Sequence, residues 1–241
     1  MIIKKLILIN FKNHSERDFQ LSPHINCFVG NNGVGKTNIL DALHYLSMGK
    51  SFLGLSDHQN IKNNKEFFSI TSNIINDDRE DTIKISLNKD AKKVIKKNDK
   101  PYPKIAEHIG YLPNVIISPY DSDLISDSGD SRRKFIDAMI SQTDAEYLFS
   151  LIQYQKAIQQ RNALLKLFAK NKTFDRDSLD IYSQPIITHG TRIFQKRKTF
   201  VTDLKPIVQH FYDIISGGKE LININYESHL SERDFGSLLE E

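Results

Sequence analysis

The sequence predicts an α/β fold followed by a helical lobe, and three observations support this prediction. The apolar run INCFV, the glycine-rich stretch GNNGVGKTN and a segment with helical apolar spacing follow one another directly. Short runs with strand character lie on both sides of that stretch. From Ser131 to about Ser216 the apolar periodicity is helical. We therefore expect an α/β lobe over 1–120, a helical lobe over 121–218 and an incomplete return to the sheet over 219–241.

Composition narrows the class of protein without choosing a function. A chain of 241 residues with a formal net charge of +3 has room for two lobes and is not basic enough to mark a nucleic-acid binder. The single cysteine, Cys27, excludes a disulfide framework and lies in an apolar run, so we expect a buried structural thiol. The first residues lack the cleavage site of a signal peptide, and no apolar run is long enough to span a bilayer. We expect a cytoplasmic protein without membrane attachment.

The elements of the first lobe follow from apolar patterning. Alternation over 3–11 and 17–21 predicts a hairpin, and the continuous apolar run 25–29 is typical of a strand covered on both faces. Ile39, Leu40, Leu43 and Leu46 have the spacing of a helix. The remaining strands are expected over 67–75, 82–87 and 115–118, with a lysine-rich polar hairpin over 89–100.

The second lobe is expected to be built from helices over 131–216. Pro185 and Pro206 are expected to break or kink them, because proline lacks a backbone donor and clashes with the preceding turn. A strand over 221–226 and a helix starting at Ser231 would follow.

The glycine-rich stretch fits the pattern G-x-x-x-x-G-K-[ST] of a phosphate-binding P-loop. Its glycines allow successive backbone N–H groups to point inward, Lys36 would neutralise the β- and γ-phosphates, and the Thr37 hydroxyl would ligate Mg²⁺. The alternative is an ordinary glycine turn, which the order strand, loop, helix disfavours. We expect ATP and Mg²⁺ as cofactors, bound by Gly30, Asn31, Asn32, Gly33, Val34, Gly35, Lys36, Thr37 and Asn38.

Three further motifs make the chain resemble a known family. The start LILINFKNH with the P-loop segment, the stretch LPNVIISPYDSDLISDSGDSRRKFIDAMI, and YQKAIQQRNALLK occur in this order. Together they are similar to the RecF family, within the ABC and SMC-type ATPases of DNA recombination and repair. The resemblance implies a P-loop NTPase fold of ABC/SMC type, with an α/β ATP-binding lobe plus a helical lobe.

The resemblance also implies roles for individual residues. Lys12 and Asn13 would help to hold the base and the α-phosphate, or else form a plain polar turn. Asp121 is the first candidate for a side chain that senses Mg²⁺ and the γ-phosphate, Asp123 the second, and a helix-cap or turn role is the alternative for both. Leu53 stands where many members carry an arginine.

A basic cluster and a set of partners complete what the resemblance implies. The cluster Arg192, Lys196, Arg197 and Lys198 would contact DNA. Full-length members would form ATP-dependent homodimers, bind gapped DNA or single-strand/double-strand junctions, act in the SOS response to DNA damage, and work with RecO and RecR.

Two elements of such an ATPase are missing from the expected places. ISGGK, residues 215–219, looks like part of a signature loop, but it precedes an expected strand rather than a helix and is interpreted as a turn. No apolar run followed by paired acids provides a Walker B strand. We therefore expect a shortened gene product or fragment that binds ATP without hydrolysing it. The alternatives are a P-loop small-molecule kinase or phosphotransferase, and a non-hydrolysing nucleotide-binding fragment.

Overall fold

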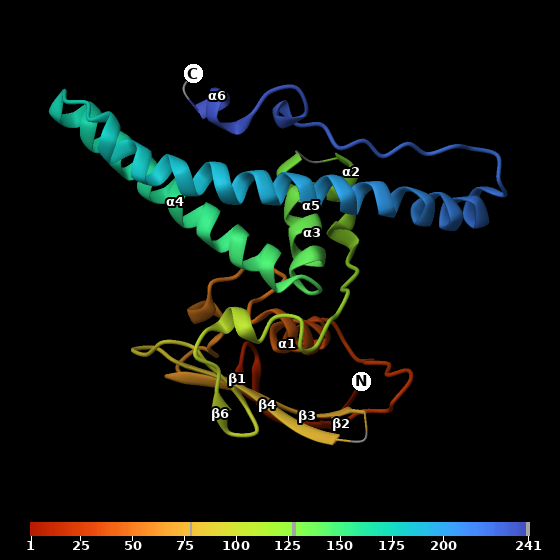
Figure 1. Cartoon of the computed structure of the whole chain (residues 1–241). Coiled ribbons are helices and arrows are strands. Elements are labelled where there is room, and N and C mark those ends of the chain that lie inside the picture. The colour runs from red at the N-terminus through yellow and green to blue at the C-terminus, as the bar shows by residue number, and fades with distance from the viewer. Residues whose placement is uncertain (78, 127–128, 240–241) are drawn as a thin grey trace. The chain divides into compact units, whose positions relative to one another are not determined.

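The computed structural model describes residues 1–77, 79–126 and 129–239 and divides into two compact units, Met1–Pro119 and Tyr120–Glu241 (Figure 1). The first unit holds a sheet with one long helix, and the second is built from helices.

The sheet of the first unit has six antiparallel strands in the order β2-β1-β3-β4-β5-β6. Apolar side chains alternate with polar or partly exposed ones along much of β1, β3 and β4. The expected hairpins at the start of the chain and in the lysine-rich stretch are confirmed. The strands are β1 (Ile2–Phe11), β2 (His14–Gln20), β3 (Phe67–Asn76), β4 (Arg79–Asn88), β5 (Val94–Lys97) and β6 (Lys100–Pro101).

The core of the first unit lies between this sheet and α1 (Lys36–Met48). Tyr45 and Leu46 of α1 are fully buried, as are the inward side chains of β1, β3 and β4. Tyr45 packs edge-to-face on Phe11 and Phe68, with ring centroids 5.9 and 5.5 Å apart. Each fully buried large side chain contributes about 1.5–3 kcal/mol, so this cluster fixes α1 against the sheet. Two short 3₁₀ helices, η1 (Asp57–Asn60) and η2 (Ile105–Glu107), complete the unit.

Three expected strands are wrong. The runs 25–29, 115–118 and 221–226 have no strand conformation, and none of the strands described pairs with them. Ile25, Ile117 and Leu221 are 81%, 83% and 93% exposed, and Cys27 is an exposed thiol rather than a buried one. A strand needs a hydrogen-bonding neighbour, which an apolar run does not supply by itself.

The second unit is dominated by two long helices. Asp144 caps α4 by accepting from the Tyr147 N–H at 2.9 Å, and Asp175 caps α5 in the same way. α5 packs back along α4 and runs without interruption through Pro185 and Pro206 (Figure 1). The prolines therefore do not break the helix, and a kink, the other expected outcome, stays a prediction. The helices are η3 (Pro119–Ser122), α2 (Asp123–Ser126), α3 (Gly129–Ser141), α4 (Ala145–Asn171), α5 (Arg176–Ser216), η4 (His229–Ser231) and α6 (Phe235–Leu239).

The end of the second unit folds onto α5. Gly190 of α5 gives room to α6, because a β-carbon there would lie 2.3 Å from the Phe235 ring. In the part of the chain that the structure describes, no helix combines the length and hydrophobicity needed to cross a membrane.

Candidate functional site

The glycine-rich loop joins the extended segment before it to the first turn of α1. Gly33 and Gly35 have φ angles of 84° and 100°, in the left-handed region that glycine adopts without strain. Gly35 is the N-cap of α1 and, as a glycine, makes no side-chain cap bond to the backbone N–H groups of the first turn. These N–H groups and the helix dipole favour an anion at this point.

Lys36 brings a positive charge to the loop. Its Nζ donates to the carbonyl oxygens of Gly30 at 2.7 Å and Asn31 at 2.9 Å, so the ammonium lies across the loop. Thr37 follows in the first turn of α1 and is exposed. An ammonium, a hydroxyl and uncapped N–H groups form a donor set that fits the phosphates of a nucleotide.

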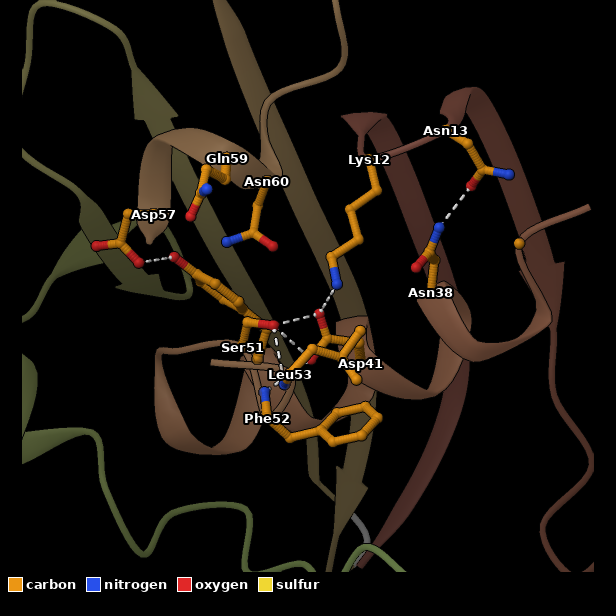
Figure 2. Close-up of polar contacts among 12 residues, drawn as sticks. Lys12, Asn13, Asn38, Asp41, Ser51, Phe52, Leu53, Asp57, Gln59 and Asn60 are labelled. Atoms are coloured by element: carbon orange, nitrogen blue, oxygen red, sulfur yellow. Dashed lines mark hydrogen bonds and ion pairs between the residues drawn. The ribbon is translucent and has the colours of Figure 1, made fainter. Parts of the chain in front are cut away.

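The turn between β1 and β2 touches the loop directly. Asn13 Nδ2 donates to the Gly33 carbonyl at 3.1 Å, and Asn13 Oδ1 accepts from Asn38 Nδ2 at 2.9 Å (Figure 2). His14 Nε2 lies 3.2 Å from the Gly35 carbonyl. A β-carbon on Gly35 would come within 2.5 Å of Asn13 and 2.6 Å of His14, so only glycine allows this approach.

The protonation state of His14 follows from its burial. Desolvation lowers the pKa of His14 below its ordinary value, although the Gly35 carbonyl opposes that effect. The ring is therefore neutral at pH 7. Because a carbonyl oxygen only accepts, Nε2 carries the proton and donates to Gly35.

Lys12 does not extend toward the loop. Its side chain is only 7% exposed and its ammonium pairs with Asp41 of α1, whose side chain has no exposed surface (Figure 2). Asp41 also accepts from Ser51 Oγ at 2.8 Å and from the Phe52 N–H at 2.8 Å. A direct contact of Lys12 with a nucleotide stays a prediction.

The residues expected near Mg²⁺ belong to different units. Thr37 lies in the first unit, while Asp121 in η3 and Asp123 in α2 lie in the second. Among the described residues there is no group of three or more His, Cys, Asp or Glu side chains that would hold a metal ion. One protein hydroxyl still suits Mg²⁺, which commonly uses few protein ligands together with nucleotide phosphates.

The basic cluster of α5 is largely occupied by ion pairs within the second unit. Arg197 makes two bonds to Asp137 of α3, at 2.8 and 2.7 Å, and is 15% exposed. Lys196 pairs with the half-buried Asp144 at 2.6 Å, and Arg192 forms an exposed pair with Glu146 at 3.5 Å. Lys198 is exposed. Exposed pairs exchange partners at little cost, whereas Arg197 has a packing role in the helical unit.

The sequence did not reveal the residues that support the P-loop directly or through the turn between β1 and β2. His14, Asp41 and Ser51 were not predicted, although Asp41 falls on the apolar face of α1 between Ile39 and Ala42. A carboxylate on a buried helical face was the signal that could have found it. Leu53, where an arginine was expected from the resemblance, is 37% exposed and bonds Ser51 through its backbone N–H at 3.2 Å.

Comparison with known proteins supports this geometry. A family model described as AAA domain matches residues 5–227. The DNA replication and repair protein RecF of Flavobacterium johnsoniae is 50% identical over 241 residues, which cover 100% of this chain and 67% of that protein. The RecF of Phocaeicola vulgatus is 42% identical over 230 residues, which cover 95% of this chain and 61% of that protein.

Two solved structures are similar as well. One is described as the recombination mediator protein RecF-ATP in the RecFOR pathway, with 31% identity and a TM-score of 0.86, covering 96% of this chain and 64% of that one. The other, described as RecF-ATPrS, has 32% identity and a TM-score of 0.84, covering 89% and 58%. The chain thus spans between 58% and 67% of the length of these four proteins. The expected fold class, a P-loop NTPase of ABC/SMC type with an α/β lobe and a helical lobe, is confirmed.

Proposed function

Because the chain belongs to the RecF family of DNA replication and repair proteins, we propose that it binds ATP with Mg²⁺ at the P-loop as the switch of a DNA-repair ATPase. The observation that carries the proposal is the donor set of the loop. It combines left-handed glycines, an uncapped helix N-terminus and the Lys36 ammonium over the loop carbonyls. A solved relative is described as RecF-ATP, which supports nucleotide binding by this family.

Each group of the loop has a defined task in this proposal. The backbone N–H groups and the N-terminus of α1 surround the β-phosphate, and Lys36 exchanges its loop carbonyls for the β- and γ-phosphate oxygens. Thr37 supplies one ligand to Mg²⁺, and Asp121 is the candidate that senses the γ-phosphate. Bound Mg²⁺ neutralises phosphate charge.

The finer functions belong to the full-length family and are proposed for this protein on that basis. ATP would join two copies of the protein, and the pair would hold gapped DNA or a single-strand/double-strand junction together with RecO and RecR. Arg192, Lys196 and Lys198 are the candidates for DNA contacts, because their charges are exposed. The sequence offers no strand that ends in paired acids, so we expect this chain to bind ATP without turnover.

Titration with a fluorescent ATP analogue and Mg²⁺ tests the proposal. We expect saturable binding that Lys36→Ala reduces by about a hundredfold or more, because the lost charge acts on the β- and γ-phosphates. Lys65→Ala, at an exposed lysine of the same unit, is the matched control and should bind as the original does. Equal affinity in Lys36→Ala would refute the site.

Hydrolysis assays with and without gapped DNA complete the test. Binding without turnover agrees with the proposal for this chain. DNA-independent turnover would instead favour a P-loop phosphotransferase and would point to a catalytic acid not identified above.

A further inference from the structure

We propose that Asp41 is a positioning residue, which holds the P-loop in its binding conformation through the turn between β1 and β2. The inference rests on the proposed function, because the loop in question is the proposed ATP site. Asp41 lies on α1, one turn after Thr37, and its side chain is completely buried. The P-loop pattern itself assigns it no role.

The Asp41 carboxylate joins three segments of the first unit. One oxygen pairs with the Lys12 ammonium from the turn, and the carboxylate also accepts from Ser51 and from the Phe52 N–H, which follow α1 (Figure 2). A buried charge is costly unless it is paired and hydrogen-bonded, and Asp41 meets both conditions. Because an apolar side chain would fill such a place at lower cost, the use of the charge lies in the arrangement that it fixes.

That arrangement is the unusual backbone of the turn. Lys12 has a φ of 52° and Asn10 a φ of 51°, in a region that residues other than glycine seldom adopt. Two backbone hydrogen bonds hold this stretch from one side. The Lys12 N–H donates to the Asn60 carbonyl at 2.8 Å, and the Lys62 N–H donates to the Asn10 carbonyl at 2.8 Å. The ion pair with Asp41 anchors the turn to α1 from the other side.

The anchored turn between β1 and β2 also orients the peptide groups of the P-loop. Asn13 and His14 hold the carbonyl oxygens of Gly33 and Gly35. A trans peptide is planar, so fixing a carbonyl in one direction aims the next residue's N–H in the opposite direction. The Asn13 and His14 contacts therefore orient the N–H groups of Val34 and Lys36, which belong to the proposed phosphate cradle. Asp41 acts on those groups through Lys12 and the turn.

Asp41→Asn tests this chain of contacts, because it keeps the shape and an acceptor oxygen but removes the charge. Two quantities are measured on the full chain: amide hydrogen exchange of residues 30–36 without nucleotide, and affinity for fluorescent ATP with Mg²⁺. We expect faster exchange in the loop and affinity weaker by about tenfold or more. Loop exchange and affinity equal to those of the original chain would overturn the proposal.

Asp57→Asn is the matched control. Asp57 is another carboxylate of the first unit that pairs with a lysine, Lys93 at 2.7 Å, and accepts from a hydroxyl, that of Tyr45. The described hydrogen bonds of its side chain go to Tyr45 and Lys93 and not directly to the turn or to the P-loop. The control should leave loop exchange and ATP affinity within about twofold of the original. The same loss in both variants would show a general effect of destabilisation and would contradict a specific role for Asp41.

The double variant Lys12→Met/Asp41→Asn separates positioning from stability. It removes the unpaired ammonium that Asp41→Asn leaves behind, so the melting temperature should recover while loop protection and ATP affinity do not. Recovery of affinity together with stability would overturn the proposal. If the original chain binds no ATP, the proposed function fails, but the exchange measurement without nucleotide still tests the role of Asp41.

Discussion

Asp41 in the first unit and Asp137 in the second use similar chemistry for different ends. Each carboxylate pairs with a basic side chain and accepts from a hydroxyl: Lys12 and Ser51 for Asp41, and Arg197 and Tyr147 for Asp137. The partners of Asp41 come from the turn between β1 and β2, which contacts the P-loop, and from the segment that follows α1. The partners of Asp137 come from α4 and α5, so that network joins helices only.

From this difference we expect position, rather than the kind of interaction, to decide what a buried ion pair does. The Asp137 network joins helices and should contribute to stability alone, whereas the Asp41 network anchors the turn that contacts the P-loop and should affect ATP binding as well. Variants of the two networks should therefore differ in whether they lower the free energy of unfolding alone or the affinity for ATP as well.

Arg197→Ala should have the largest effect on stability. It leaves the largely buried Asp137 carboxylate without its cation, which we expect to cost about 3 kcal/mol of unfolding free energy in the second unit. Urea unfolding measures that cost, and ATP affinity should not change. Arg192→Ala, which removes an exposed pair, is the control and should cost at most about 1 kcal/mol. Equal costs for both variants would contradict a packing role for Arg197.

Gly35→Ala should have its main effect on ATP affinity, the opposite of what we expect for Arg197→Ala. A β-carbon there would meet Asn13 and His14 at 2.5 and 2.6 Å, so the turn or the loop must move. We expect ATP affinity to fall by about tenfold or more, from strain of roughly 1–2 kcal/mol plus this clash. Gly54→Ala is the control, since Gly54 also has a positive φ of 72° but nothing within 4 Å. Normal ATP binding by Gly35→Ala would contradict the close approach.

Tyr147→Phe should have a smaller effect on the helical unit. It removes the hydroxyl that donates to Asp137 but keeps the ring, which is fully buried. We expect a loss of about 1 kcal/mol in urea unfolding, with ATP binding unchanged. A loss as large as that of Arg197→Ala would mean that the hydroxyl, not the charge, holds the three helices.

These contrasts also show what the sequence could reveal. The P-loop was predictable because its glycines, Lys36 and Thr37 are adjacent in the chain and the signal is local. The ion pair of Arg197 was not, since Asp137 lies 60 positions away, and the sequence shows only a basic cluster. In the same way, the resemblance implied for Lys12 either a nucleotide contact or a place in a plain polar turn, and nothing in its sequence surroundings identifies Asp41 as its partner.

The wrong strands have a similar cause. The runs 25–29 and 221–226 have the composition of strands, but a strand forms only where a neighbour completes its hydrogen bonds. The alternating strands β1, β3 and β4 were predicted correctly because they pair with one another and cover one core.

The smallest predicted effect is the contribution of the Asp81 charge to the pH dependence of the unfolding free energy. Hydrogen bonds from Tyr111, Asn98 and Lys97 lower the pKa of Asp81 from 3.8 to about 2. Because the folded pKa is depressed, this stabilisation is fully present above about pH 4 and is lost as the pH falls toward 2. Its size is about 1 kcal/mol or less.

Urea unfolding of the original chain and of Asp81→Asn between pH 2 and 7 measures that contribution. The difference in stability between the two proteins should shrink as the pH falls below about 4. A difference that is constant over this range would show that the charge of Asp81 contributes nothing.

The central claim is that ATP is bound by the loop at residues 30–38, and hydrogen exchange with and without Mg·ATP tests it most directly. We expect slower exchange at saturating nucleotide, concentrated in residues 30–38 and in the turn at 12–14, with α4 and α5 unchanged. Binding that leaves exchange at 30–38 as it was, or that protects another region instead, would contradict the account.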